Sequence, residues 1–137
     1  MIRILKFYVF TVIVMILISC SSNKPFEPPT ENNLANFTAI QQKIFNTNCA
    51  ISGCHAGMNP TAGMNLSEGQ AYGNIKDVQS VLYPSLKRVD SGKSDESVLV
   101  LILRGTLTPR MPLSGTVLTA AEIDSIALWI DSGAPNN

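Results

Sequence analysis

One short stretch of this 137-residue chain, Cys49-Ala50-Ile51-Ser52-Gly53-Cys54-His55, constrains its fold more than any other. The stretch contains the only histidine of the sequence and two of its three cysteines. Thiols and an imidazole are reactive groups and good metal ligands, and here they lie very close together in sequence. The rest of the chain is therefore expected to fold around whatever these three side chains hold.

A cysteine directly followed by histidine, with another cysteine shortly upstream, is typical of covalent haem attachment. The two thiols can form thioethers with the haem vinyl groups, and the neighbouring imidazole can reach the iron. Four residues separate Cys49 from Cys54, whereas the usual motif has two. In the usual motif the cysteines lie about one helical turn apart. The additional residues must therefore bulge outward, and Gly53 offers the backbone freedom for that.

Two other interpretations of the same residues remain open. A disulfide between Cys49 and Cys54 would close a small ring, which stabilises a fold by only about 2 kcal/mol. A zinc site would have three ligands, two of them neighbours in sequence, and no obvious fourth ligand. We favour one covalently bound haem c, with the disulfide as the main alternative.

Residues 1–19 have the features of an export signal. A positive region with Arg3 and Lys6 precedes an apolar run over 7–18, which is short for a membrane span and typical of a secretory signal. The run ends in Leu-Ile-Ser-Cys, which resembles the bacterial lipobox, where cleavage leaves an acylated N-terminal cysteine, here Cys20. An uncleaved anchor helix is the alternative.

The remainder of the chain is expected to be a tether at 20–34 followed by one domain at 35–137. Three prolines and several small polar residues make the tether unsuitable for a helix. Ser21 resembles the residue found after the cysteine in outer-membrane lipoproteins. We therefore expect a lipid-anchored protein of the cell envelope, attached to the outer membrane and facing the periplasm. That compartment permits either haem attachment or a disulfide.

The charge of the exported chain excludes one class of partner. Residues 20–137 contain eight Lys and Arg residues and ten Asp and Glu residues, so this part is close to neutral and slightly acidic. Nucleic-acid binding requires a basic face, and nothing in the sequence supports one.

The first and last helices have the clearest signals. Residues 37–47 carry an apolar stripe at helical spacing after a suitable N-cap, Asn36. Residues 119–122 form a capping box, and Gly133 followed by a proline marks the end of the last helix. The apolar stripe of this last helix places Trp129 on its flank.

Two further helices are predicted between them. A weak one covers 67–72, with Ser67 as N-cap, and a firmer one covers 95–104, with Ser94 as N-cap and Gly105 as stop signal. The centre of the second, 98–103, is apolar on every side and therefore needs cover on every side.

Long loops at 56–66, 74–92 and 106–118 separate these helices, and no strand pairing is convincing. Such loops are uncommon in a small domain unless they serve a site. A haem is a large, flat and apolar object against which they can pack. The sequence thus predicts an all-α fold, with three to four helices and long loops around a covalently bound haem.

The order of these motifs resembles the small class I c-type cytochrome domains of the bacterial envelope, sometimes called planctomycete-type. The resemblance covers about residues 36–135 and rests on five segments: 49–55, Gly63-Met64-Asn65-Leu66, Ser97-Val98-Leu99, Met111-Pro112 and Trp129-Ile130-Asp131-Ser132-Gly133-Ala134. It implies a cytochrome c-like fold in which the first and last helices pack together. It also implies that Cys49 and Cys54 hold the haem, with His55 as proximal and Met111 as distal ligand.

The inventory of ligands also favours Met111. Because His55 is the only histidine, two imidazoles within this chain cannot bind one iron. Met58 is too close to His55 for the chain to wrap around the haem, and Met64 would require a taut loop. Met64 or an open distal site remain alternatives to Met111. We otherwise interpret Met58 and Met64 as side chains that fill gaps in a core.

These observations predict a lipid-anchored monohaem c-type cytochrome that carries single electrons and is not an enzyme. Ligation by His and Met raises the reduction potential and leaves no coordination site for a substrate. An open distal site would instead permit peroxidase-like activity. The alternative function is a haem-free binding or adaptor lipoprotein with a Cys49–Cys54 disulfide. Arg88, Arg104 and Arg110 are candidates for contacts with the haem propionates, but we interpret them as surface charges. The sequence does not identify the redox partner.

Overall fold

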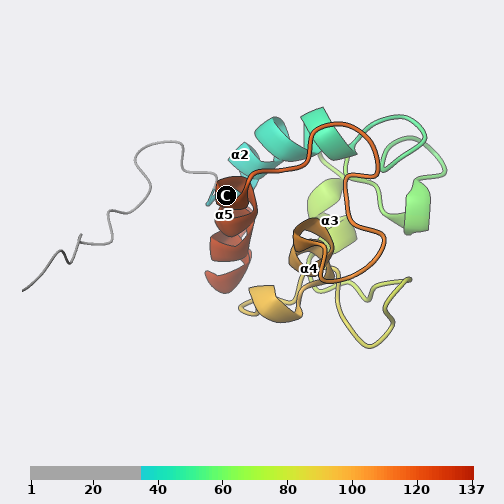
Figure 1. The fold of residues 1–137 in the computed structure, drawn as a ribbon. Coiled ribbons are helices and arrows are strands. Elements are labelled where there is room, and N and C mark those ends of the chain that lie inside the picture. The colour runs from blue at the N-terminus through green and yellow to red at the C-terminus, as the bar shows by residue number, and fades with distance from the viewer. Residues whose placement is uncertain (1–34) are drawn as a thin grey trace, which may run out of the picture. The chain divides into compact units, whose positions relative to one another are not determined.

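The computed structural model describes residues 35–137 (Figure 1). The predicted signal peptide, the lipidated Cys20 and the tether lie outside the described residues. The described part is helical and contains no strands, as predicted for an all-α fold. Its elements are α2 (Phe37–Ile40), η1 (Gln41–Cys49), η2 (Thr61–Gly63), α3 (Ala71–Ile75), η3 (Ser94–Glu96), α4 (Val98–Arg104) and α5 (Ala120–Asp131). None of the helices within 35–137 is long and apolar enough to cross a membrane.

The first predicted helix is present, but most of it is a π-helix. Asn36 is the N-cap, and its side chain accepts a hydrogen bond from the Ala39 amide at 2.8 Å. After four α-helical residues the chain continues as η1, which has wider turns, and the Ala50 amide donates to the Phe45 carbonyl at 2.7 Å. π-Helical segments are rare and often lie at functional sites. This one ends at Cys49.

Helix α5 has the predicted capping box. The Thr119 hydroxyl accepts a hydrogen bond from the Glu122 amide, and the Glu122 carboxylate accepts one from the Thr119 amide. The predicted position of Trp129 on the flank is wrong, because its side chain is completely buried. The indole Nε1 donates to the Pro135 carbonyl at 2.8 Å, so this core position has its polar atom satisfied.

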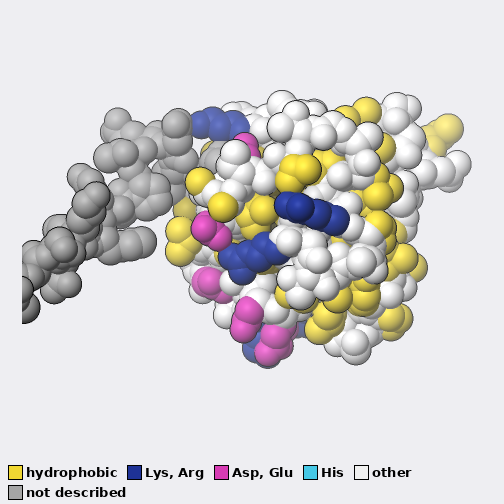
Figure 2. All heavy atoms as spheres, in the orientation of Figure 1, with side chains coloured by type: hydrophobic (Ala, Val, Ile, Leu, Met, Phe, Trp, Pro, Cys, Tyr) yellow, Lys and Arg dark blue, Asp and Glu magenta, His cyan; other side chains and the backbone are white. Residues whose placement is uncertain are grey.

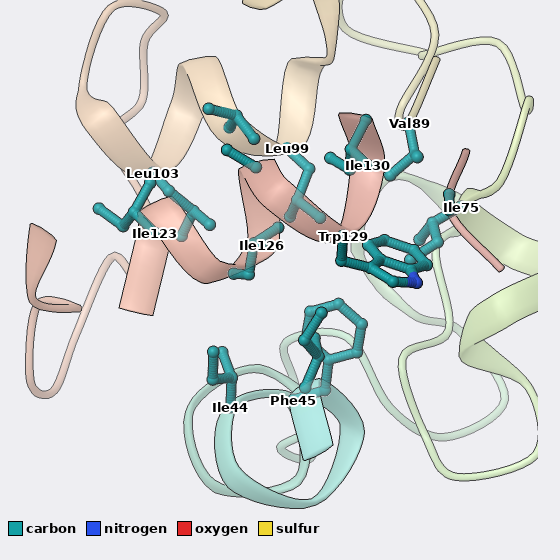
Figure 3. Packing of buried hydrophobic residues seen from close by; sticks show 14 of the residues in the cluster. Ile44, Phe45, Ile75, Val89, Leu99, Leu103, Ile123, Ile126, Trp129 and Ile130 are labelled. Atoms are coloured by element: carbon teal, nitrogen blue, oxygen red, sulfur yellow. The ribbon is translucent and has the colours of Figure 1, made fainter. Parts of the chain in front are cut away.

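The first and last helical segments pack against each other. The ring centroids of Phe37 and Trp129 are 5.5 Å apart. Ile44 and Phe45 of η1 point toward Ile126 and Trp129 of α5 (Figure 3). The residues after α5 also contact the first segment, since the Asn137 backbone carbonyl accepts a hydrogen bond from the Thr38 amide at 2.8 Å.

The predicted helix 95–104 is broken near its start. Residues 94–96 form the short turn η3, Ser97 is extended with a ψ of 121°, and α4 begins only at Val98. Ser94 is not a helix cap, because its amide and hydroxyl both donate to the Asp131 carboxylate at 2.9 Å. The predicted end is confirmed: Gly105 adopts a left-handed conformation with a φ of 78°.

Helix α3 starts later than the predicted 67–72. Residues 67–70 form a turn, in which Gly69 has a φ of 76° that cannot continue a helix. The region after α3 is irregular, as predicted, with isolated bridges Lys76–Val89 and Gln79–Lys87 in place of strands.

Candidate functional site

An open cavity lies among the loops on one side of α4. Its volume is about 1130 Å³ when the space continuous with solvent is included. Four parts of the chain supply the walls: the 48–55 segment, the loop around η2, the 80–82 loop and the 111–114 loop, together with one face of α4.

The walls are mostly apolar. Helix α4 contributes the side chains of Val98, Leu99, Ile102 and Leu103. By contrast, Val100 is completely buried in the core and does not line the cavity. The apolar centre of this helix is thus covered by the core on one side and borders the cavity on the other.

All four side chains predicted to bind the haem line this cavity: Cys49, Cys54, His55 and Met111. The first three come from one loop, whereas Met111 belongs to a loop far away in sequence. The amide of Met111 donates to the Ile102 carbonyl at 3.2 Å, which holds this loop against α4. The fifth predicted site residue, Cys20, lies outside the described part of the chain.

The Cys49–Cys54 loop is compact despite its expanded spacing. The Cys54 amide donates to the Ile51 carbonyl at 2.9 Å, and the His55 amide donates to the Cys49 carbonyl at 3.2 Å. Gly53 has a φ of 83°, a left-handed conformation that strains any side-chain-bearing residue. This glycine therefore accommodates the additional residues, as the sequence predicts.

Both cysteines of this loop are free thiols in the structure. Burial, together with the neighbouring Cys54, raises the pKa of the Cys49 thiol to about 11. Cys49 is therefore protonated at neutral pH.

The imidazole of His55 is held by a neighbouring loop. Its Nδ1 lies 3.3 Å from the Met64 carbonyl oxygen, and burial lowers the pKa of the ring below its usual value. A neutral ring that donates from Nδ1 keeps the lone pair on Nε2 for a metal. The backbone of this loop is fixed too, because the Leu66 amide donates to the His55 carbonyl at 2.8 Å.

The three methionines of the domain differ in environment. The interpretation of Met58 as a gap-filling core residue is wrong, since its side chain is 97% exposed. Met64 packs against the core and also lines the cavity, as does Met111. Because the Met64 carbonyl contacts the His55 ring, its backbone lies on the same side of any group bound to that ring. This favours Met111 for the opposite side.

Of the three candidate arginines, Arg88 alone lines the cavity, whereas Arg104 and Arg110 do not. Arg88 is only 8% exposed, so its interpretation as a surface charge is wrong. The guanidinium donates to the carbonyls of Asn74 at 2.7 Å, Ala62 at 2.8 Å and Gly63 at 3.4 Å. Burial lowers the pKa of this group.

No carboxylate within residues 35–137 forms an ion pair with Arg88. Arg104, in contrast, pairs with Asp124 at 2.9 Å on the surface, and Arg110 is exposed. A buried cation without a counter-ion is costly, so the cavity favours an anionic group. In sequence Arg88 stands between Lys87 and Val89, so its neighbours give no signal that it is buried.

The donor set fits a covalently attached haem better than a bare metal ion. Thiols, an imidazole and a thioether face an apolar cavity that also holds a buried cation. Within the described range, no three His, Cys, Asp or Glu side chains come together as a possible metal site, which leaves the zinc interpretation without support. Comparison with models of known protein families, with curated proteins and with solved structures found no match to this chain.

Proposed function

We propose that this chain is a lipid-anchored monohaem c-type cytochrome that carries single electrons at the bacterial cell envelope. The observation that supports it best is the shared cavity. Cys49, Cys54 and His55 come from one loop, and Met111 comes from a distant one, yet all four line the same apolar space.

Each of these residues has a role that its surroundings support. The thiols of Cys49 and Cys54 would fix the haem covalently, with His55 Nε2 as proximal and Met111 sulfur as distal ligand. The bound haem would supply a reversible one-electron Fe(III)/Fe(II) couple. The Met64 carbonyl would orient the His55 ring and fix its tautomer, as the outer partners of metal-bound histidines do.

Arg88 provides a second line of support. A haem carries two propionate carboxylates, and a guanidinium is well suited to bind a carboxylate through two parallel hydrogen bonds. Arg88 is buried in the cavity wall and forms no ion pair with the described carboxylates, so a propionate would supply the missing counter-ion.

Electron transfer fits these features better than catalysis. With His55 and Met111 both bound, the iron would have no open position for a substrate. The apolar walls would limit the access of water to the iron, which would help to set its potential. The chain would then be a carrier and not an enzyme.

The decisive experiment is expression in a host with haem-attachment machinery. We expect a red protein whose colour survives extraction with acidified acetone, because thioether bonds resist it. The variant Cys49→Ser/Cys54→Ser should lose its haem in the same extraction. A colourless protein with a disulfide between the two cysteines would instead support the haem-free adaptor.

The distal ligand can be tested separately. Met111→Leu nearly conserves volume and should cost less than about 1.5 kcal/mol of stability. It should nevertheless abolish the absorption band that arises from Met-to-iron charge transfer. Met64→Leu is the matched control and should keep the band, whereas loss of the band in Met64→Leu alone would reassign the ligand.

A further inference from the structure

The hydroxyl of Tyr83 joins two of the loops that supply walls of the cavity. The Thr108 amide donates to Tyr83 Oη at 3.1 Å, and the hydroxyl donates in turn to the Thr108 carbonyl. One side chain thus satisfies both backbone polar groups of a residue 25 positions further along the chain. Tyr83 directly follows the 80–82 wall, and Thr108 comes shortly before the 111–114 wall. Tyr83 itself does not line the cavity.

Tyr83 projects from a turn that is held by hydrogen bonds of its own. The Tyr83 amide donates to the Ser80 hydroxyl at 3.2 Å, and the Leu86 amide donates to the Tyr83 carbonyl at 2.9 Å. The Ser80 amide in turn donates to the Leu86 carbonyl at 3.0 Å, and Ser80 is buried. A tyrosine side chain has only two rotatable bonds, so little freedom is lost when its hydroxyl is held in place. The turn can therefore serve as an anchor for another loop.

No other polar contact joins these two loops. Among residues 35–137, the two hydrogen bonds of Tyr83 are the only ones between the 79–86 segment and the 106–118 loop. An ion pair between them is impossible, because the 79–86 segment contains no charged residue. Figure 2 shows a similar division on the surface: acidic side chains gather toward the lower left of the face in view, and hydrophobic side chains spread over its right side.

Met111 lies close to this contact and to a second one. Its amide donates to the Ile102 carbonyl of α4, and Thr108 stands three residues before it in sequence. Pro109 has a fixed φ, which leaves few free dihedral angles between Thr108 and Met111. Helix α4 therefore holds the loop on one side, and Tyr83 holds it on the other.

We propose that Tyr83 is a positioning residue for Met111. Its hydroxyl holds the 106–118 loop across the cavity and so keeps the Met111 thioether within reach of the haem iron. The proposal rests on the proposed function, in which Met111 is the distal ligand. Without the hydroxyl the loop moves away from the iron more often, and a competing ligand then takes the vacated position more easily.

Binding of imidazole to the oxidised, haem-loaded full chain in detergent tests this role. An imidazole nitrogen replaces the Met111 sulfur at Fe(III), so one iron–sulfur bond breaks, one iron–nitrogen bond forms and no electron is transferred. Tyr83→Phe removes only the hydroxyl and leaves the cavity walls intact. We expect this variant to bind imidazole about tenfold more tightly, the size of effect that the loss of ordinary hydrogen bonds produces. Its Met-to-iron charge-transfer band should disappear at a correspondingly lower imidazole concentration.

Tyr72→Phe is the matched control. The Tyr72 hydroxyl donates to the Ala134 carbonyl at 2.9 Å, and Tyr72 does not line this cavity. The same atom is removed from the same residue type, so a general loosening of the fold would appear in both variants. The imidazole affinity of Tyr72→Phe should stay within about twofold of the wild type.

Met111→Leu provides a second control. This variant has no thioether that imidazole must displace, so the addition of Tyr83→Phe should leave its imidazole affinity unchanged. The combination separates an effect on Met111 from a general widening of the cavity.

Amide hydrogen exchange tests the contact itself, without reference to the haem. The Thr108 amide should be protected in the wild type and in Tyr72→Phe, because its hydrogen bond to Tyr83 Oη is intact in both. In Tyr83→Phe it should exchange about tenfold faster.

Tighter imidazole binding in Tyr83→Phe alone, which is absent in the Met111→Leu background, supports the proposal. A red protein whose affinity is unchanged by Tyr83→Phe overturns it and leaves the proposed function intact. Equal gains in the two tyrosine variants also overturn it, as does a gain that persists beside Met111→Leu. A Thr108 amide without protection in the wild type overturns it even if Tyr83→Phe fails to fold. A colourless protein overturns the proposed function, and the positioning role of Tyr83 with it.

Discussion

The core between η1 and α5 and the cavity beside α4 are built in different ways. In the core, side chains mostly from helical segments pack together, and Ile44, Phe45 and Trp129 have no solvent exposure. At the cavity, walls from several loops leave a space open. We therefore expect variants in the core to act mainly on stability, and variants at the cavity to act mainly on the proposed function. Variants can therefore be chosen that change the core and leave the cavity intact, or the reverse.

The largest effect is expected in the core. Trp129→Ala removes a completely buried side chain and its Nε1 hydrogen bond to Pro135, and should cost about 3–5 kcal/mol of unfolding free energy. Chemical denaturation measures this loss. Leu128→Ala, at an exposed position of the same helix, should stay within about 0.5 kcal/mol of wild type. A small loss in Trp129→Ala would contradict the assignment of stability to this core.

A smaller effect is expected from the buried cation of the cavity. Arg88→Met leaves the Ala62, Gly63 and Asn74 carbonyls without their donor, and should cost about 1–3 kcal/mol. Arg88→Lys should not restore the loss, because one ammonium group cannot replace the planar fork of a guanidinium. In the haem-loaded protein, removal of this positive charge should also lower the reduction potential, since it favours the oxidised state.

Arg104→Met is the control for both measurements on Arg88, the free energy of unfolding and the reduction potential. Arg104 lies on the surface and pairs with the exposed Asp124, so its loss should change stability by less than about 1 kcal/mol. The reduction potential of the haem-loaded Arg104→Met variant should equal that of the wild type. An equal shift of potential in both variants would show that Arg88 acts through net charge alone.

Substitution of alanine for either of two glycines should change the free energy of unfolding by about 1 kcal/mol, with opposite sign at the two positions. Gly105 has a φ of 78°, and a Cβ added there would lie 3.1 Å from the Arg110 side chain, so Gly105→Ala should destabilise the protein. Gly73 lies within α3, where a Cβ would meet nothing within 4 Å. Gly73→Ala should therefore stabilise it. Thermal unfolding of both variants tests this, and effects of the same sign would contradict it.

The smallest effect is expected at a surface ion cluster, where Lys76 lies 2.9 Å and Lys87 lies 3.2 Å from the Asp77 carboxylate. Hydrogen bonds from Lys76 and Ser91 hold the pKa of Asp77 well below its usual value. A carboxylate with a lowered pKa stabilises the fold above its unfolded pKa of about 3.9, and this contribution fades as pH falls further.

Asp77→Asn should therefore destabilise the protein slightly at neutral pH, and the difference should shrink as the pH falls below about 4. Asparagine tolerates the left-handed backbone at this position, where φ is 55°, so the variant changes charge and spares conformation. Unfolding midpoints measured between pH 2 and 7 would reveal this. A difference that persists at the lowest pH would contradict the electrostatic origin.

Sequence signals predict the helices that form the core far better than the loops that form the cavity. The capping box of α5, the Asn36 cap and the Gly105 stop are local, since each depends on residues within one or two turns. The break at Ser97 could not be predicted, because it depends on Ser94 bonding to Asp131, far away in sequence. The burial of Trp129 likewise depends on Phe37 and Phe45, which only the fold brings near.

The residues of the site likewise differ in how far the sequence predicts their position. The proximity of Cys49, Cys54 and His55 is encoded by sequence spacing, whereas the prediction that Met111 lies near them rested on the inventory of ligands and on the resemblance. The burial of Arg88 could not be predicted, because its partners are backbone carbonyls that leave no trace in residue types. The same holds for the Met64 carbonyl that contacts His55.

The π-helical form of η1 also limits which insertions and deletions this segment can tolerate. In an α-helix each residue added or removed turns everything after it by about 100° around the axis, and in the wider turns of a π-helix the angle is smaller. Loss or gain of one residue between Gln41 and Asn48 would therefore change the direction of Cys49, unless a change between π-helical and α-helical turns offsets it. The length of this helix is therefore part of the site, even though most of its side chains never touch the cavity.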